Sequence, residues 1–117
     1  MELSSETEGR ICVISVAAPR IDMAGALAFK DDMRRLTVAA PEVVILDLGA
    51  VSFIDSSGLG AIVAIMKHLA PERELVLAGL TPHVEKVFRL TRMDSVFRLF
   101  SRLEDARAAV QTSVAGG

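Results

Sequence analysis

The residues best suited to chemistry lie in one short segment, residues 53–60, which reads Phe-Ile-Asp-Ser-Ser-Gly-Leu-Gly. The segment joins a predicted strand to a predicted helix and places Asp55, Ser56 and Ser57 at the joint. One role for these side chains is helix capping, since an oxygen of Asp55 or Ser56 can accept a hydrogen bond from the free N–H groups of the first turn. The other role is covalent, since a hydroxyl at a helix N-terminus tolerates an added phosphate in the positive local field. The sequence leaves both roles open.

Two glycines, Gly58 and Gly60, open the predicted helix, although each costs a helix roughly 0.5–1 kcal/mol relative to alanine. Glycine at this place lets another backbone or a nucleotide approach closely. Helical spacing predicts a core stripe on this helix made of Leu59, Ile62, Val63 and Met66. The same helix carries small residues, chiefly Gly58, Gly60, Ala61 and Ala64. We expect them to face either a second buried layer or a partner protein.

Catalytic motifs do not fit this segment. A nucleophile elbow needs glycine two residues before its serine, where Ile54 stands. A dinucleotide fingerprint through Gly58 and Gly60 needs glycine or alanine at Val63, and no Gly-Lys-Ser/Thr run of a phosphate-binding loop exists. A serine hydrolase would have to recruit one of the two histidines, but His68 is expected in solvent and His83 in the first turn of a helix. We therefore expect no catalytic residue.

Composition narrows the function classes further. The 117 residues are 51% hydrophobic and 4% aromatic, and 13 basic against 15 acidic residues give a net charge of −2. This balance argues against a nucleic-acid partner, which normally selects a basic patch. One cysteine and two histidines do not make a conventional metal cage without carboxylates, so we expect neither a metal nor another cofactor.

Hydropathy raises the question of a membrane segment. Mean hydropathy is +0.44, yet the longest apolar stretch covers residues 58–66, well short of the ~20 residues that a spanning helix needs. The acidic start of the chain carries no basic signal-peptide region. The expectation is a cytoplasmic protein without direct membrane insertion, in which Cys12 is reduced.

Strand-like and helix-like segments alternate along the chain. Strands are predicted at residues 11–17, 43–48, 51–54, 74–78 and 96–100, and helices at residues 23–36, 56–69, 82–90 and 103–110. Asp22 and Thr81 are expected to cap the helices that follow them. The alternation predicts one α/β domain over residues 1–117, with a core at 11–110 and a loose tail at 111–117. Its sheet should be mixed but mostly parallel, with about four to five strands covered by about four α-helices.

A parallel sheet would gather several of these groups. Asp22, Ser56 and the loop after Ala78 all follow predicted strands, so they should meet at the carboxyl edge of the sheet, where ligands of open α/β folds collect. Asp55 adds a second carboxylate there.

The pattern resembles the STAS domain family. The resemblance rests on residues 43–48 and 51–60, which look like the signature of the family. Its most specific part is the Asp-Ser-Ser-Gly-Leu-Gly element at residues 55–60. Residues 81–91 and 96–100 are similar to the third helix and last strand of the family, and Asp22 matches its acidic residue before the first helix. The chain departs from the family at Pro19 and Arg20, where many members have glycine and an acidic or other polar residue.

Within the family, the chain resembles stand-alone anti-sigma factor antagonists. The resemblance implies that the unphosphorylated protein binds a GHKL-type serine kinase that is also an anti-sigma factor, and thereby frees a sigma factor. Phosphorylation of Ser56 would break that complex, and a PP2C-type phosphatase would restore the serine. The partner-binding residues would be Asp22, Asp55, Ser57, Gly58, Leu59, Gly60, Ala61 and Ala64. The protein would be a substrate and a ligand, not an enzyme.

Two other functions stay open. STAS-like domains also serve as scaffolds or regulatory subunits of membrane transport complexes, without phosphorylation. An acyl-transfer enzyme using Ser56 is disfavoured because no histidine is placed to activate the hydroxyl.

Overall fold

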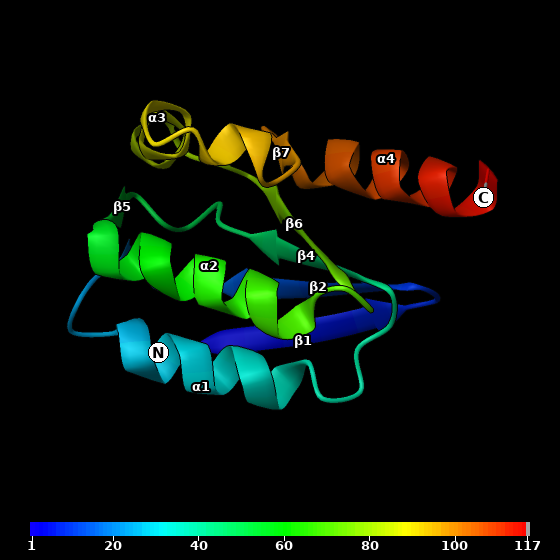
Figure 1. The fold of residues 1–117 in the computed structure, drawn as a ribbon, viewed down its shortest axis with the longest axis horizontal. Coiled ribbons are helices and arrows are strands. Elements are labelled where there is room, and N and C mark those ends of the chain that lie inside the picture. The colour runs from blue at the N-terminus through cyan, green and yellow to red at the C-terminus, as the bar shows by residue number, and fades with distance from the viewer. Residues whose placement is uncertain (117) are drawn as a thin grey trace.

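The computed structural model describes the backbone of residues 1–116 and the side chains of residues 1–111. Its main sheet has five strands in the order β1-β2-β4-β6-β7, in which β1 is antiparallel to β2 and every other neighbouring pair is parallel (Figure 1). In that order the strands are β1 (Leu3–Glu8), β2 (Ile11–Val16), β4 (Val43–Asp47), β6 (Glu74–Ala78) and β7 (Leu99–Phe100). The predicted mixed, mostly parallel sheet is thus confirmed.

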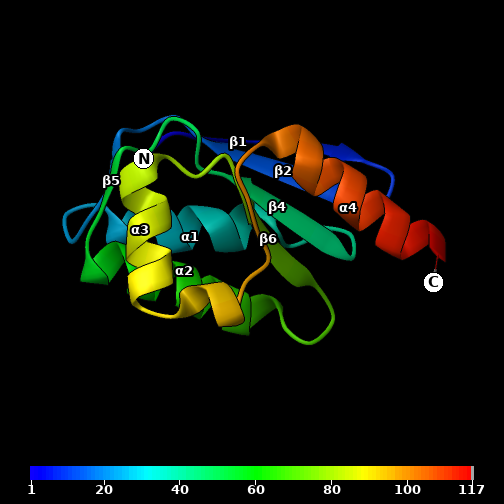
Figure 2. The same ribbon diagram turned by 90° about the horizontal axis from the view of Figure 1, so that it is seen from above.

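Helices cover both faces of the sheet, which explains why the central strands are continuous apolar runs rather than alternating ones. One face packs against α1 (Ala26–Leu36), α2 (Ser56–Leu69) and α3 (Pro82–Leu90). The other packs against α4 (Leu103–Gly116), which lies across the strands in Figure 2. Helices α1 and α2 run side by side (Figure 1).

A second, two-stranded sheet lies beside the first. Its strands are β3 (Arg20–Ile21) and β5 (Phe53–Ile54), paired in parallel with Arg20 opposite Phe53. The strand predicted at residues 51–54 therefore shortens to two residues and leaves the main sheet. Its position matters because both short strands end directly before the polar segments that start with Asp22 and Asp55.

Several predicted boundaries are wrong. Helix α1 begins at Ala26 rather than residue 23, and Gly25 is its N-cap, so Asp22 does not cap it. The last strand shrinks to β7 because Val96, the C-cap of a 3₁₀ turn at residues 93–95, has helical backbone angles. Helix α4 continues to Gly116, where a loose tail was expected from residue 111, and Gly117 lies outside the described residues.

Two local predictions also need correction. Strand β1 was not predicted, because its residues are polar and its position at the sheet edge leaves most of them exposed. Thr81 is the N-cap residue of α3, but its hydroxyl donates to the carbonyl oxygen of Val51 at 2.7 Å instead of satisfying the helix.

The buried stripe of α2 is rotated from the predicted one. The buried residues of the helix are Gly58, Ala61, Ile62, Ile65 and Leu69, whereas Leu59, Val63 and Met66 are half-buried. The reason is close packing at the start of the helix. A Cβ atom on Gly58 would clash with the carbonyl oxygen of Ile21 and lie 2.8 Å from its carbonyl carbon. Only glycine lets α2 approach β3 this closely.

Adding one methyl group at Gly58 or at Gly60 is expected to have opposite effects. Gly58→Ala places a Cβ atom against the backbone of Ile21, which can shift only if the strand around it shifts too. This variant should therefore lower the free energy of unfolding by about 1–3 kcal/mol. Gly60→Ala meets no atom within 4 Å and should raise that free energy by roughly 0.5–1 kcal/mol through helix propensity. Chemical denaturation of both variants measures the difference, and a Gly58→Ala protein as stable as the wild type would contradict the close packing.

Candidate functional site

Asp55 joins two segments of the chain that are far apart in sequence. Its Oδ1 atom accepts a hydrogen bond from the N–H of Gly58 at 2.9 Å and so caps α2. Its Oδ2 atom accepts from the N–H of Met23 at 3.0 Å, in the loop after β3. The sequence left the choice of cap open between Asp55 and Ser56, and the structure assigns it to Asp55.

These hydrogen bonds also set the acidity of Asp55. The N–H of Gly58 is the largest influence and lowers the pKa of the carboxyl below its ordinary value of 3.8, because it stabilises the ionised form. Partial burial acts in the opposite direction, and the N–H of Met23 lowers the pKa further. Asp55 is therefore a fixed negative charge at neutral pH.

Because Asp55 caps α2, the hydroxyl of Ser56 is not needed as a helix cap. Ser56 is the first residue of α2 and is exposed, and its hydroxyl makes no hydrogen bond to any residue that the structure describes. Ser57 beside it is half-buried. Ser56 is thus the accessible hydroxyl of the pair, at the positive end of a helix of 14 residues.

Asp22 follows β3, a strand that the sequence did not predict, and it shares an edge with Asp55 in the short β3–β5 sheet rather than in the main sheet. Strands β3 and β5 are in parallel register, with Ile21 opposite Ile54, so the residues that follow them, Asp22 and Asp55, leave the strands together. The carboxylate of Asp22 is not free. Its Oδ2 atom accepts a hydrogen bond from Nε of Arg20 at 3.1 Å. Asp22 therefore forms an ion pair with Arg20 instead of capping the first helix, as was expected.

The small-residue surface predicted on α2 is only partly accessible. Gly60 is exposed, and Leu59 and Ala64 are half-buried. Gly58 and Ala61, which we expected to contact a partner, are instead buried against the sheet layer. This correction follows from the rotation of α2 described above.

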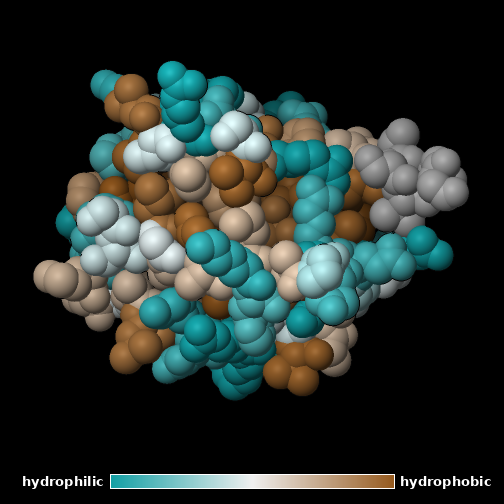
Figure 3. Space-filling model, viewed as in Figure 1, coloured by the Kyte–Doolittle hydropathy of each residue, from teal (hydrophilic) through white to brown (hydrophobic). Residues whose placement is uncertain are grey.

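Two exposed apolar side chains near the start of α1 were missed by the sequence analysis. Met23 is 76% exposed and Leu27 is 66% exposed. Because Met23 is hydrogen-bonded to Asp55, these side chains lie at the end of the molecule where Ser56 is found. Brown and tan apolar groups reach the surface at the left of Figure 3, where α1 and α2 begin. Leu27 does not fall at helical spacing from Phe29 and Met33, the buried residues of α1. An apolar residue outside this buried stripe is the signal that could have predicted an exposed apolar side chain.

An aromatic stack borders the site. The rings of Phe53 and His83 are stacked, with centroids 5.1 Å apart and 13° between their planes, and the guanidinium carbon of Arg20 lies 4.2 Å from the centroid of Phe53. The Nε2 atom of His83 is 3.4 Å from the carbonyl oxygen of Ile54. In the described residues neither His83 nor His68 hydrogen-bonds to Ser56.

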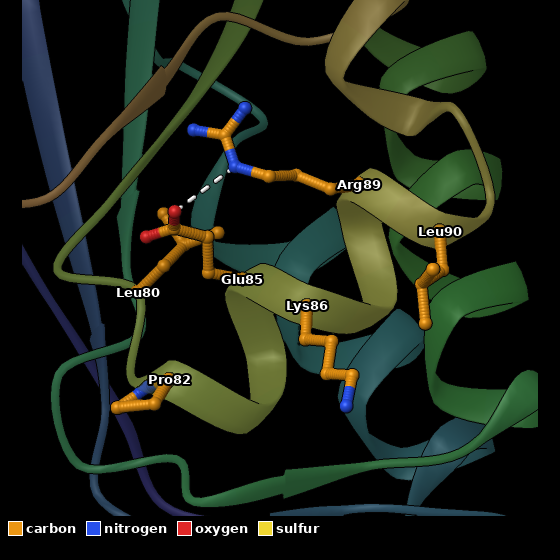
Figure 4. Close-up of a pocket in the computed structure, with 6 residues that line it drawn as sticks. All are labelled: Leu80, Pro82, Glu85, Lys86, Arg89 and Leu90. Atoms are coloured by element: carbon orange, nitrogen blue, oxygen red, sulfur yellow. Dashed lines mark hydrogen bonds and ion pairs between the residues drawn. The ribbon is translucent and has the colours of Figure 1, made fainter.

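Other features of the molecule lie apart from this site. A hollow of about 460 Å³ follows the outer side of α3, where Glu85 accepts a hydrogen bond from Arg89 at 2.9 Å (Figure 4). Among the described residues, no three His, Cys, Asp or Glu side chains are grouped to hold a metal ion. No helix in that part of the chain is long and apolar enough to cross a membrane.

The sheet, the helices and the Asp55-Ser56 junction can now be compared with known proteins. The family model of the STAS domain matches residues 2–106. The chain belongs to the STAS domain family.

Individual relatives agree with this assignment. This STAS domain is similar to BtrV of Bordetella bronchiseptica, with 39% identity over 72 residues, which cover 61% of the chain and 62% of that relative. It is also similar to the anti-sigma-F factor antagonist RsfB of Mycobacterium tuberculosis, with 27% identity over 86% of the chain and 82% of the relative. The crystal structure of an anti-sigma factor antagonist from Mycobacterium paratuberculosis superimposes with a TM-score of 0.84 at 29% identity, covering 94% of this STAS domain and 93% of that chain.

The stability of this STAS domain is expected to depend on pH through Asp55. Because the folded state lowers the pKa of the carboxyl, Asp55 stabilises the fold above its ordinary pKa of 3.8, and this contribution is lost as the pH falls through the lowered value. Asp55→Asn keeps one acceptor oxygen but does not ionise. The difference in free energy of unfolding between wild type and Asp55→Asn should be largest near neutral pH and shrink in acid. Urea denaturation at a series of pH values measures it, and a difference independent of pH would contradict the assigned role.

Proposed function

We propose that this STAS domain is an anti-sigma factor antagonist whose binding to its partner is controlled by phosphorylation of Ser56. The observation that carries the proposal is the exposed hydroxyl of Ser56, which is released from capping by Asp55. The proposal is supported by the relative RsfB and by the superimposed mycobacterial structure, both named as antagonists of anti-sigma factors.

The partner in this proposal is a GHKL-type serine kinase that is also an anti-sigma factor. Binding of the unphosphorylated domain would withdraw the kinase from its sigma factor. The kinase would supply ATP and the base. The oxygen of Ser56 attacks the γ-phosphorus, the hydroxyl proton passes to the kinase, and ADP leaves. A PP2C-type phosphatase would hydrolyse the phosphoserine and restore the binding form.

The proposed docking surface surrounds Ser56. It combines the exposed apolar side chains of Met23 and Leu27 with the open backbone at Gly60, to which Leu59 and Ala64 add half-buried area. A glycine on a helix face allows close approach of a partner, and exposed apolar groups provide a favourable area to bury. Such a surface suits a protein ligand rather than a small molecule.

Phosphorylation would act locally on this surface. A phosphate adds about −1.5 to −2 charges at neutral pH, next to the carboxylate of Asp55 and near that of Asp22. The N-terminus of α2 compensates in part, by roughly 0.3–1 kcal/mol at an exposed site, so the fold should survive. A partner that covers Ser56, by contrast, must desolvate a bulky anion, which costs several kcal/mol unless new hydrogen bonds form. We therefore propose release by direct conflict at the interface.

In this function the chain needs no catalytic group of its own. The kinase and the phosphatase carry the chemistry, and the domain acts as their substrate. The same proposal places the protein in the cytoplasm, where its partners meet ATP and the transcription machinery.

Ser56, and not Ser57, is expected to take the phosphate. The domain is incubated with ATP and its candidate GHKL-type kinase, and the modified peptide is mapped by mass spectrometry. Ser56→Ala should abolish uptake and bind the kinase constitutively, whereas the matched control Ser57→Ala should still be phosphorylated. Ser56→Asp should mimic release only in part, because it has less charge and bulk than phosphoserine. Phosphate on Ser57, or unchanged uptake in Ser56→Ala, would overturn the assignment.

The docking surface is tested by a charge placed at Gly60. Gly60→Arg has room on the free domain, so the fold should be retained, but a partner covering this position must bury an unpaired charge. Binding of the kinase should weaken by several kcal/mol. Gly60→Ala adds a methyl group without charge, so it should weaken binding less than Gly60→Arg does and separates the effect of bulk from the effect of charge. Circular dichroism checks the fold of each variant, and a folded Gly60→Arg protein with unchanged affinity would show that the partner binds elsewhere.

A further inference from the structure

Arg20 presents a positive charge on the short β3–β5 sheet, whose two strands end directly before Asp22 and Asp55. It is the first residue of β3 and lies opposite Phe53 of β5. Its neighbour Ile21 and the paired Ile54 are buried, and side chains alternate along a strand, so Arg20 and Phe53 point outward on the same side. The side chain of Arg20 is 56% exposed.

Two contacts hold the guanidinium group of Arg20. Its carbon lies 4.2 Å from the centroid of the Phe53 ring, within the range of a cation–π interaction. Its Nε atom donates to Oδ2 of Asp22 at 3.1 Å. The ring of His83 also stacks on Phe53, so Arg20, Phe53 and His83 form one cluster.

These contacts leave one edge of the guanidinium group available. The terminal atoms Nη1 and Nη2 of Arg20 make no hydrogen bond to any residue that the structure describes. Two parallel N–H groups of this kind match the two oxygens of a carboxylate. Because the group is already oriented, little conformational entropy is lost when such a carboxylate binds.

We infer that Arg20 binds a carboxylate of the protein that docks over Ser56, and that this contact helps to select the partner. The inference rests on the proposed function, which supplies the docking partner. Arginine has only donors, so a partner that covers Arg20 must provide acceptor oxygens or leave N–H groups unpaired. A carboxylate suits this place better than a neutral carbonyl, because it offers two oxygens to the paired N–H groups and forms stronger, charge-assisted hydrogen bonds. Asp22 satisfies only Nε. A partner with lysine or arginine at the facing position would be repelled, and this gives the contact its specificity.

The test measures affinity for the kinase that phosphorylates the wild-type domain. All variants carry Ser56→Ala, so that ATP does not break the complex, and isothermal titration calorimetry gives the dissociation constants. Arg20→Glu should weaken binding by about tenfold to a hundredfold, the range expected for a lost charged hydrogen bond. Arg20→Lys keeps the charge but loses the paired donors and should fall in between. Lys67→Glu, at the far end of α2, makes the same change in net charge and should alter affinity less than twofold.

A second pair of variants separates direct binding from an effect through Asp22. In an Asp22→Asn background, Arg20→Gln should still weaken binding by about tenfold if Arg20 meets a partner carboxylate. If Arg20 only neutralises Asp22, the Arg20→Gln change should have no effect in that background, which would overturn the inference.

The outcomes distinguish this inference from the proposed function. A domain that is phosphorylated on Ser56 and binds the kinase equally well with Arg20→Glu and with Lys67→Glu retains the function but overturns the role of Arg20. A wild-type domain that neither binds nor is phosphorylated by the kinase overturns both. A selective loss in the Arg20 variants, with circular dichroism unchanged, supports both.

Discussion

The candidate site depends on one carboxylate with two hydrogen bonds. Asp55 closes the first turn of α2 through the N–H of Gly58 and holds the loop after β3 through the N–H of Met23. The first bond stabilises a helix terminus that would otherwise leave N–H groups unpaired. The second bond ties the approach to α1 to the start of α2. This bridge brings the exposed side chain of Met23 to the end of the molecule where Ser56 is exposed.

A steric constraint supports the same junction. Gly58 lies directly beneath the carbonyl group of Ile21, so α2 meets the short β3–β5 sheet at backbone contact. This contact rotates the helix, buries Ala61 and turns Gly60 toward solvent. Gly58 and Gly60 look equivalent in the sequence but have different roles in the structure. Gly58 allows internal packing, whereas Gly60 leaves the outer side of the helix open.

In the proposed function, the charges at the junction give phosphorylation of Ser56 a large effect on partner binding. Asp55 is ionised at neutral pH, Asp22 is paired with Arg20, and the N-terminus of α2 adds a partial positive charge. The free domain can solvate a phosphate at this place because Ser56 is exposed. A complex that excludes water from Ser56 loses that solvation. A phosphate on Ser56 would therefore raise the free energy of the complex more than that of the free domain. This asymmetry suits the proposed regulator, which must stay folded with and without the phosphate.

The sequence determined the class of fold, since apolar runs such as residues 43–48 and the amphipathic helix spacings are local properties. Helix 56–69 and strand 74–78 were predicted at their observed bounds, and the Asp-Ser-Ser-Gly element was enough to find the junction. Local patterns did not reveal β1, whose polar residues become a strand only by pairing with β2. Nor did they show which oxygen caps α2, which side of α2 is buried, or that Arg20 stacks on Phe53. The cap is a local hydrogen bond between Asp55 and Gly58, three residues apart. The buried side of α2 and the stack of Arg20 on Phe53 were decided by contacts between segments more than 30 residues apart, such as Ile21 with Gly58, because close packing depends on distances that exist only after the chain has folded.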